Sequence, residues 1–400
     1  MRSALTITGV AFLAAALAYS ALTLIAMVAW RFNGILHRRR ARPATLSPIS
    51  ILKPLCGTEP GLYEQLRSFC LQDYPSFQII FGIRLRDDPA LGVALRLQEE
   101  FEHLEIDVVV DPTEHGGNRK SSNLINMLPR ARYDVLAIAD SDTIVTPDYL
   151  RTVVAELHDA KIGLVTSAYV SVPTRDLWSR LGAMYVNEWY MPSVLLTWLF
   201  GYRGYASGQT LCLRRSTLEA VGSFHALADC LADDYRLGER IRELGLRIAL
   251  SPVRILVEQH EPTFAALEAH EMRWMRTLRV LRPRSFRMLF LSFSLPLAGL
   301  GLCLCLFGGG SAGGRLAALA PALFAGTVIA RLGLHFVYRI GHLERFVADL
   351  GLLAMRDLLL CWVWLRAFFA SRIAWRDHVF AIGADGVMRP DVPALTRDSP

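Results

Sequence analysis

Residues 4–30 of this chain carry no charged side chain, and this apolar stretch constrains the fold more than any other feature. A helix needs about 20 such residues to cross a bilayer. A secretory signal peptide has a shorter apolar core and a small-residue cleavage site, so the stretch predicts a retained anchor over residues 1–31. Five arginines follow within residues 31–42, against one before the stretch. The positive-inside rule therefore puts the next domain in the cytosol.

Between residues 49 and 265, short apolar runs alternate with helical patterns. Strands are predicted at 49–53, 77–84, 106–110, 135–139, 162–170, 208–213 and 247–250. Helices are predicted at 59–71, 89–103 and 234–244. Such alternation predicts an α/β fold in which helices cover a mostly parallel sheet. We expect residues 49–265 to form one cytosolic domain flanked by transmembrane helices.

The C-terminal third of the sequence again has the character of a membrane protein. Residues 285–308 and 315–337 are each long and apolar enough to span a bilayer. The segment 346–370 is apolar too, but it carries Arg356 and Asp357 near its middle. Charges inside a membrane are costly unless protein or water surrounds them. We therefore predict a multi-pass protein with three full spans, in which 346–370 re-enters the membrane or lies at its interface.

Basic residues are concentrated beside the apolar segments. The chain carries a net charge of +6, and arginines gather at 31–42, 273–287 and 366–376. This distribution favours contact with anionic lipid headgroups over contact with nucleic acid. We predict a basic interfacial segment at 266–287, membrane helices over 288–370 and a tail at 371–400. The seven cysteines show no paired metal-binding spacing, which is typical of reduced thiols in the cytosol.

Two carboxylates follow the apolar run 135–139 directly. The run ends in Asp140, Ser141 and Asp142, which predicts a buried strand with two acidic side chains at its carboxyl end. Open α/β sheets bind ligands just beyond the carboxyl ends of their strands. Paired carboxylates there suit a hard divalent cation, Mg²⁺ or Mn²⁺, that also binds phosphate oxygens. The pattern points to a nucleotide diphosphate as ligand, and the alternative is an acidic loop that caps the next helix.

Two further motifs carry groups suited to a nucleotide-linked sugar. Asp87 and Asp88 follow a predicted strand, where a carboxylate can accept hydrogen bonds from a base or ribose, although Asp-Asp-Pro is equally typical of a turn. The Gly-rich stretch 116–124 contains Lys120 and Asn123, which can hold sugar or phosphate oxygens. Its alternative is a basic surface loop. The stretch lacks the Gly-Lys-Ser/Thr order of a Walker loop.

Asp233 and Asp234 stand at the predicted start of a helix, in the motif ADDY. We interpret Asp234 as a general base that takes a proton from an acceptor hydroxyl while the hydroxyl oxygen attacks a sugar carbon. Aspartates at this position are also common helix caps, which is the structural alternative.

Two aromatic and basic stretches border the predicted membrane segments. Residues 270–287 begin with His270, Arg273 and Trp274, and the last two offer a cation and a flat indole to a diphosphate sugar. The same stretch also fits an interfacial amphipathic helix, and both interpretations can hold. Residues 176–202 fit an in-plane helix that lines a lipid access path, or ordinary core.

In their order, these motifs resemble those of the membrane-bound family 2-like glycosyltransferases of the GT-A fold, and most closely the ceramide glucosyltransferase family. The motifs are ILKPLCG, LQDYPSFQIIFGI, RDDPA, GGNRKSSNLINMLP, ADSD, ADDY and RW. The resemblance implies a metal-dependent, inverting transfer of a hexose from a UDP-sugar to a lipid hydroxyl. It implies that Asp88, with Asp87, faces uridine. Asp140 and Asp142 face the metal and diphosphate, Asp234 is the base, and Arg273 with Trp274 closes over the donor.

One position departs from the family pattern. The family has Gln or Arg three residues before the Arg-Trp pair, whereas this chain has His270, whose imidazole still donates hydrogen bonds. The change indicates a different donor or acceptor from glucose and ceramide. A related bacterial branch transfers N-acetylglucosamine to hopanoid polyols such as bacteriohopanetetrol, which would place this chain in a bacterial inner membrane. The alternatives are a processive polysaccharide synthase and a non-catalytic lipid-binding scaffold.

Overall fold

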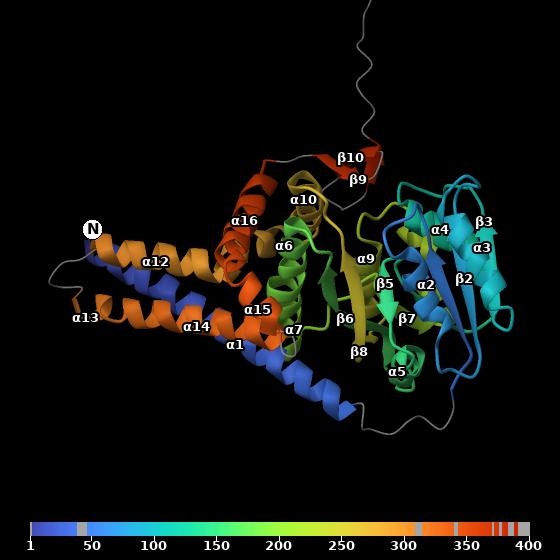
Figure 1. Ribbon diagram of the computed structural model, residues 1–400, viewed down its shortest axis with the longest axis horizontal. Coiled ribbons are helices and arrows are strands. Elements are labelled where there is room, and N and C mark those ends of the chain that lie inside the picture. Colours follow the sequence, from blue (N-terminus) through green and yellow to red (C-terminus); the bar gives the residue numbers. More distant parts are fainter. Residues whose placement is uncertain are drawn as a thin grey trace, which may run out of the picture. The chain divides into compact units, whose positions relative to one another are not determined.

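The computed structural model describes residues 2–37, 46–308, 314–339, 343–369, 372–375, 378–382 and 388–390. The chain divides into two compact units (Figure 1). The first, here called the helical unit, consists of Met1–Ile35, Arg175–Gly201 and Glu261–Ala370. The second, here called the sheet unit, consists of Leu36–Thr174, Tyr202–His260 and Ser371–Pro400. Each unit is described by itself.

The sheet unit is built on an eight-stranded sheet with the order β3-β2-β1-β4-β7-β6-β8-β5 (Figure 1). Its strands are β1 (Ile49–Pro54), β2 (Phe77–Ile83), β3 (Glu105–Val110), β4 (Val135–Ile138), β5 (Thr143–Val145), β6 (Ile162–Pro173), β7 (Leu211–Arg214) and β8 (Arg247–Gln259). Strand β7 runs antiparallel to β4 and β6, and β5 runs antiparallel to β8. The other pairs are parallel. The predicted α/β class with a mostly parallel sheet is confirmed.

Helices accompany this sheet. They are α2 (Leu62–Cys70), α3 (Ala90–Glu100), α4 (Arg119–Met127), α5 (Tyr149–Glu156), α8 (Arg215–Ala220) and α9 (Asp233–Glu243), with the short turns η1 (Leu128–Arg130) and η3 (Phe224–Leu227). Those predicted at 59–71, 89–103 and 234–244 are present, and the other three were not predicted. Every residue of β2 and of β4 is buried. Strands buried on both faces read as continuous apolar runs, which is why these strands are visible in the sequence.

The topology sets the place of a ligand site. Strand β1 has β2 on one side and β4 on the other, so the direction in which the sheet grows reverses at β1. Strands β1 and β4 are parallel, and their carboxyl ends therefore meet at one edge. Open α/β sheets bind ligands in the crevice outside such a switch point.

Three features of the strands in the sheet unit differ from the prediction. Strand β5 has only three residues and was not predicted. Strand β8 continues past Pro252 to Gln259, helped by a register shift against β6 between Ser167 and Tyr169. The segments β9 (Arg372–Trp375), β10 (His378–Ile382) and β11 (Met388–Pro390) form a small antiparallel sheet that the apolar pattern did not indicate.

The helical unit contains α1 (Arg2–His37), α6 (Leu177–Tyr185), the π-helix η2 (Val186–Tyr190), α7 (Met191–Leu199), α10 (Phe264–Leu281), α11 (Pro283–Met288), η4 (Leu289–Ser292), α12 (Ser294–Gly308), α13 (Gly314–Ala317), α14 (Ala320–Arg339), α15 (Leu343–Asp349) and α16 (Leu352–Ala367). Within the predicted stretch 176–202, residues 177–199 thus form one helical run. Most of its side chains from Leu181 to Leu195 are buried within the unit, which favours the ordinary-core interpretation of this stretch.

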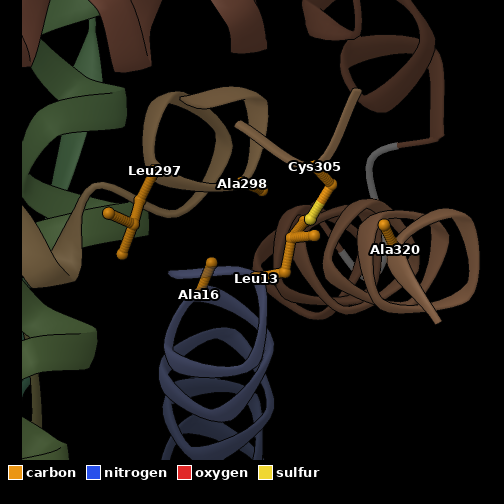
Figure 2. Close-up of a cluster of buried hydrophobic side chains, with 6 residues drawn as sticks. All are labelled: Leu13, Ala16, Leu297, Ala298, Cys305 and Ala320. Atoms are coloured by element: carbon orange, nitrogen blue, oxygen red, sulfur yellow. The ribbon is translucent and has the colours of Figure 1, made fainter. Parts of the chain in front are cut away.

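Small residues let α1, α12 and α14 pack closely (Figure 2). Leu13 and Ala16 of α1 meet Leu297, Ala298 and Cys305 of α12 and Ala320 of α14 in one buried cluster. At the crossing of α1 and α12, a Cβ added to Gly9 would lie 2.6 Å from the carbonyl oxygen of Gly301. Backbones that approach this closely at glycines are typical of helices packed within a membrane.

Two helical stretches of the described residues are long and apolar enough to cross a membrane. They are Arg2–Phe32 and Arg315–Arg339. A third candidate is the pair Pro283–Ser292 and Ser294–Gly308, which is bent by 67° at the break. The predicted span at 285–308 is therefore not one straight helix.

Candidate active site

The carboxyl end of β4 delivers Asp140 to the predicted edge of the sheet. The backbone N–H of Asp140 donates to the carbonyl of Gly208 at 3.0 Å. Its side chain forms an ion pair with Lys120, whose Nζ lies 2.6 Å from Oδ1. The next helix, α5, has Asp148 at its N-cap, so neither Asp140 nor Asp142 is the cap of that helix.

Lys120 bridges two acidic segments of the sheet unit. It is the second residue of α4, and its Nζ also lies 3.4 Å from Oδ2 of Asp233. Burial alone would lower the pKa of Lys120, but the carboxylates of Asp140, Asp233 and Asp234 raise it above its ordinary value. The lysine is therefore charged, and its ammonium lies at the carboxyl end of β4.

The Gly-rich stretch positions Lys120 by packing against residues 228–230. Asn118 caps α4 by accepting from the Ser121 N–H at 2.9 Å, and its side chain donates to the carbonyl of Cys230 at 2.8 Å. A Cβ added to Gly116 would lie 2.6 Å from the carbonyl oxygen of Ala228. Glycine is thus required for this close approach. The first part of the stretch therefore holds the start of α4 against residues 228–230, and Lys120 follows it on α4.

Gly208 connects Asp140 with Asp234. Its carbonyl accepts from the Asp140 N–H, and its own N–H donates to Oδ2 of Asp234 at 3.1 Å. A Cβ added to Gly208 would lie 2.4 Å from Oδ2 of Asp140 and 2.8 Å from Nζ of Lys120. A side chain at this position would displace the ion pair of Asp140 and Lys120. The sequence interpretation did not single out this residue, because its role depends on neighbours that are distant in the chain.

Asp234 lies in the first turn of α9, whose N-cap position is occupied by Ala232 without a side-chain cap. Its Oδ1 accepts from the N–H of Tyr235 at 2.7 Å. Burial and the neighbouring carboxylate of Asp233 raise the pKa of Asp234 to about 6, although Lys120 acts in the opposite direction. A carboxylate with a raised pKa can accept a proton more readily than an ordinary aspartate.

Asp142 has a buried carboxylate oxygen, Oδ1, with no hydrogen-bond partner among the described residues. Burial, followed by repulsion from Asp140 and Glu59, raises the pKa of Asp142 to about 7. An orphaned oxygen beside a second carboxylate fits a divalent cation. The described residues contain no group of three or more His, Cys, Asp or Glu side chains that could enclose a metal. A cation held by Asp140 and Asp142 would therefore need oxygen ligands from elsewhere.

Lys53, near the end of β1, contacts the residues that follow β4. It is fully buried, and its Nζ donates to the backbone carbonyl of Asp140 at 2.5 Å and lies 3.9 Å from the ring centroid of Phe69. Burial lowers its pKa to about 7, against the attraction of Asp142 and Asp140. Lysine is almost never fully buried without a partner, so its place in the apolar run ISILK was a usable signal that the sequence interpretation missed.

Asp88 and Asn123 make backbone contacts. Both carboxylate oxygens of Asp88 accept from the Gly57 N–H, at 2.9 and 3.1 Å, and Oδ1 also accepts from the Ala90 N–H at 2.9 Å. The side chain of Asn123 donates to the carbonyl of Gly82 at 2.8 Å. The Asp88 contacts link the loop after β1 to the loop after β2, and the Asn123 contact links α4 to β2. Asp87 is exposed.

In the helical unit, α10 carries His270, Arg273 and Trp274. Nδ1 of His270 lies 2.6 Å from Oε1 of Glu261, and its ring centroid lies 4.3 Å from that of Trp274. Trp274 stacks on Tyr190 at 6.3 Å, with an angle of 16° between the rings. These contacts hold the imidazole and the indole in fixed orientations within the unit.

Comparison of the sequence with known proteins gives a matching family and several similar proteins. The sequence model of the family described as Glycosyl transferase family 21 matches residues 9–388. Ceramide glucosyltransferase 1 of Caenorhabditis elegans is 25% identical over 252 residues, which cover 62% of this chain and 53% of that protein. Ceramide glucosyltransferase of Komagataella phaffii is 32% identical over 107 residues, which cover 26% of this chain and 21% of that protein. The chain thus spans about half the length of the Caenorhabditis elegans relative. It spans 21% of the Komagataella phaffii relative.

Among solved structures, the mannosyltransferase PcManGT from Pyrobaculum calidifontis, in complex with GDP-Man and Mn²⁺, is similar to this chain. The identity is 19% and the TM-score is 0.48, and the match covers 83% of this chain and 99% of that one.

Proposed function

The chain belongs to glycosyl transferase family 21, as the resemblance to ceramide glucosyltransferases predicted, and we propose that it transfers glucose or N-acetylglucosamine from a UDP-sugar to a hydroxyl of a membrane lipid. The acceptor is ceramide or a hopanoid polyol, and the transfer inverts the anomeric carbon. One observation carries the proposal. Lys120, Asp140, Gly208 and Asp234 are joined at the carboxyl end of β4, beside the unpartnered oxygen of Asp142.

In the proposed reaction, Asp234 accepts the proton of the lipid hydroxyl. The hydroxyl oxygen forms a bond with the anomeric carbon, and the bond from that carbon to the diphosphate oxygen breaks. Lys120 exchanges its ion pair with Asp140 for the oxygens of the diphosphate and stabilises the charge that develops on this leaving group. Lys53 keeps the backbone of Asp140 in place through its carbonyl contact.

A divalent cation, Mg²⁺ or Mn²⁺, would be held by Asp140 and Asp142 and would supply neutralisation of the diphosphate charge. Asp88 with Asp87 would bind uridine, and Asn123 would help to hold the sugar or phosphate oxygens of the donor. His270, Arg273 and Trp274 would act on the diphosphate and sugar. We propose that the catalytic domain is cytosolic in a multi-pass protein of the bacterial inner membrane.

A single transfer is favoured over processive synthesis. A processive synthase needs enough membrane helices to enclose a channel for its polymer, and the described residues contain two candidate spans, or up to three. A non-catalytic scaffold would have no need for acidic side chains with raised pKa values at a sheet edge.

The test uses the purified full-length protein in detergent with Mg²⁺ or Mn²⁺. UDP-glucose and UDP-N-acetylglucosamine are each offered with ceramide and with bacteriohopanetetrol, and products are identified by mass. We expect one glycolipid product, which Asp234→Asn abolishes and Asp159→Asn retains, since Asp159 pairs with Arg247 at an exposed position. A folded protein that binds UDP-sugar but glycosylates neither lipid would contradict the proposed acceptor class.

A further inference from the structure

Helix α16 is too short to cross a bilayer. Its 16 residues extend over about 24 Å, whereas the hydrocarbon core of a membrane is about 30 Å thick. In Figure 1, α16 runs across the direction of α12 and α14, which belong to the same helical unit. The end of α14 completes one of the two candidate spans of the described residues. The length and the direction of α16 both argue against a further straight span over 346–370.

One face of α16 is apolar and exposed. Its residues recur at intervals of three or four and therefore form a single line along the helix, here called the α16 stripe. Exposed large side chains that follow one another in this way mark a surface that meets a partner or lipid. The stripe consists of Met355, Leu358, Trp362, Leu365 and, just after the last turn, Phe369, which are between 37% and 89% exposed.

The opposite face of α16 carries charges, and protein covers them. Arg356 pairs with Glu271 of α10 at 2.6 Å, and Asp357 pairs with Arg331 of α14 at 3.2 Å. Val363 continues this face and is fully buried. An amphipathic helix of a soluble protein turns its charges to the solvent, so α16 has the inverse arrangement. Charges turned inward and apolar side chains turned outward are typical of a helix that borders lipid.

The ion pair with α14 gives the depth at which α16 begins. Arg331 lies eight residues before Arg339, the end of the apolar span, which is about 12 Å along the helix. Ile329 and Phe336 lie on either side of Arg331 in the sequence of α14 and are 69% and 50% exposed. This level of α14 therefore presents apolar side chains to the acyl chains, and the ion pair holds the start of α16 beside it.

The far end of α16 has side chains that suit a membrane–water boundary. The indole N–H of Trp362 donates to Oε1 of Glu268 at 3.2 Å, although the residue is 51% exposed. Arg366 pairs with the same carboxylate and is 48% exposed. Tryptophan with one polar and one apolar edge, and arginine that extends toward headgroups, are both common at this boundary.

We propose that α16 lies in the plane of the membrane, with the α16 stripe immersed in the acyl chains of one leaflet. Such helices bury their apolar face about 5–10 Å below the headgroups. Lipid is favoured over a second copy of the chain because the stripe begins beside an apolar span and ends at interfacial side chains. Through the contacts with Glu268 and Glu271, α16 then fixes α10 and its Arg-Trp pair to the membrane surface. This inference does not depend on the proposed transfer reaction.

The lipid contact is tested on the unchanged full-length protein in phosphatidylcholine nanodiscs, with one protein per disc. The discs contain phosphatidylcholine that carries a diazirine on an acyl chain, and mass spectrometry locates the adducts after irradiation. We expect adducts along the α16 stripe and none on buried Val363. Ile329 on α14 is the positive control, and Leu95, which is 42% exposed on α3 of the sheet unit, should stay unlabelled.

The in-plane orientation is tested by the side of the membrane on which the chain leaves α16. One epitope is inserted between α14 and α15, within residues 340–342, and another is added after residue 400 in a separate protein. Antibody access is compared in sealed vesicles of one orientation. An in-plane α16 leaves both epitopes on the same side, whereas a spanning α16 puts them on opposite sides.

A matched pair of charged variants gives a further measurement. Leu358→Asp places an unpaired carboxylate among the acyl chains and should lower the melting temperature in nanodiscs by several degrees. Leu95→Asp, at an exposed position of α3, should leave it unchanged. If Leu358→Asp does not fold, the photolabelling and the epitopes decide.

The outcomes separate lipid contact from the other arrangements. Adducts along the stripe, with both epitopes on one side, support the proposal. Epitopes on opposite sides overturn it, because α16 then spans the membrane. A stripe without adducts, while Ile329 is labelled, overturns the lipid contact, and a dimer in the same discs would then assign the stripe to a second copy. None of these results bears on the transfer of sugar, which the product assay measures separately.

Discussion

The sheet unit and the helical unit both bury charged side chains, but they arrange them in opposite ways. At the carboxyl end of β4, carboxylates gather around one lysine, and an oxygen of Asp142 has no partner in the described part of the chain. In the helical unit, Arg356 and Glu271 form a bidentate pair at 2.6 and 2.7 Å, with both side chains 2% exposed. The first arrangement leaves a carboxylate oxygen without a partner among the described residues, whereas in the second both carboxylate oxygens of Glu271 are paired with Arg356.

This contrast gives opposite expectations for mutation. Removing a carboxylate from the β4 cluster relieves repulsion and should impair function while sparing stability. Removing one from a satisfied pair exposes a buried opposite charge and should impair stability first.

The largest effect is expected for Asp234→Asn. Loss of the proposed base should lower kcat by about 10²- to 10⁴-fold, while the melting temperature stays equal or rises because repulsion with Asp233 is relieved. Turnover with the preferred UDP-sugar and lipid, together with thermal unfolding, measures both. Near-normal turnover in a folded variant would show that Asp234 is not the base.

The next effect is expected for Glu271→Gln, which leaves the buried guanidinium of Arg356 without its counter-charge. We expect a loss of about 3–5 kcal/mol in stability, read from thermal unfolding in detergent. Glu268→Gln is the matched control on the same helix, because Glu268 pairs with the half-exposed Arg366 and should change stability by less than about 1 kcal/mol. Equal losses in the two variants would contradict the contrast.

In a pH titration between about 4 and 6, we expect the β4 cluster to make activity and stability change in opposite directions. The pKa of Asp234 is raised from 3.8 to about 6, so the base form is lost below pH 6, and activity should be about tenfold lower at pH 5 than at its plateau. The folded state holds the extra proton, so this group makes the protein less stable as pH rises from about 4 through 6. Asp234→Asn should remove that part of the pH dependence of unfolding. A flat activity profile between pH 5 and 7 would contradict the raised pKa.

The two arrangements were not equally visible in the sequence. Asp140 and Asp142 could be predicted because an apolar run with carboxylates at its end is a local pattern. Gly208 could not, and the lysine in the apolar run ISILK marked Lys53 as unusual without giving its role, since each residue acts on Asp140 from a distant part of the chain. Their importance depends on strand order, which no local pattern gives.

The helical unit shows the same limit on what a sequence can predict. In the sequence, Arg356 and Asp357 are adjacent opposite charges within an apolar segment. In the structure, adjacent positions point to different neighbours on the helix: Arg356 binds Glu271, and Asp357 binds Arg331. The sequence predicted that these charges need protein or water around them, but it could not identify their partners, which lie on other helices.

The smallest effect, and the most specific to the contrast, is expected for Asp142→Asn. In a chelator, this variant should be more stable than wild type by about 1–2 kcal/mol, or a few degrees in melting temperature, because it removes a buried carboxylate with an unpartnered oxygen. Added Mn²⁺ with UDP should then stabilise wild type and leave the variant unchanged. Asp159→Asn should follow wild type in both conditions. If Asp142→Asn is instead destabilising in a chelator, Asp142 has a structural partner, and the sheet unit satisfies its charges as the helical unit does.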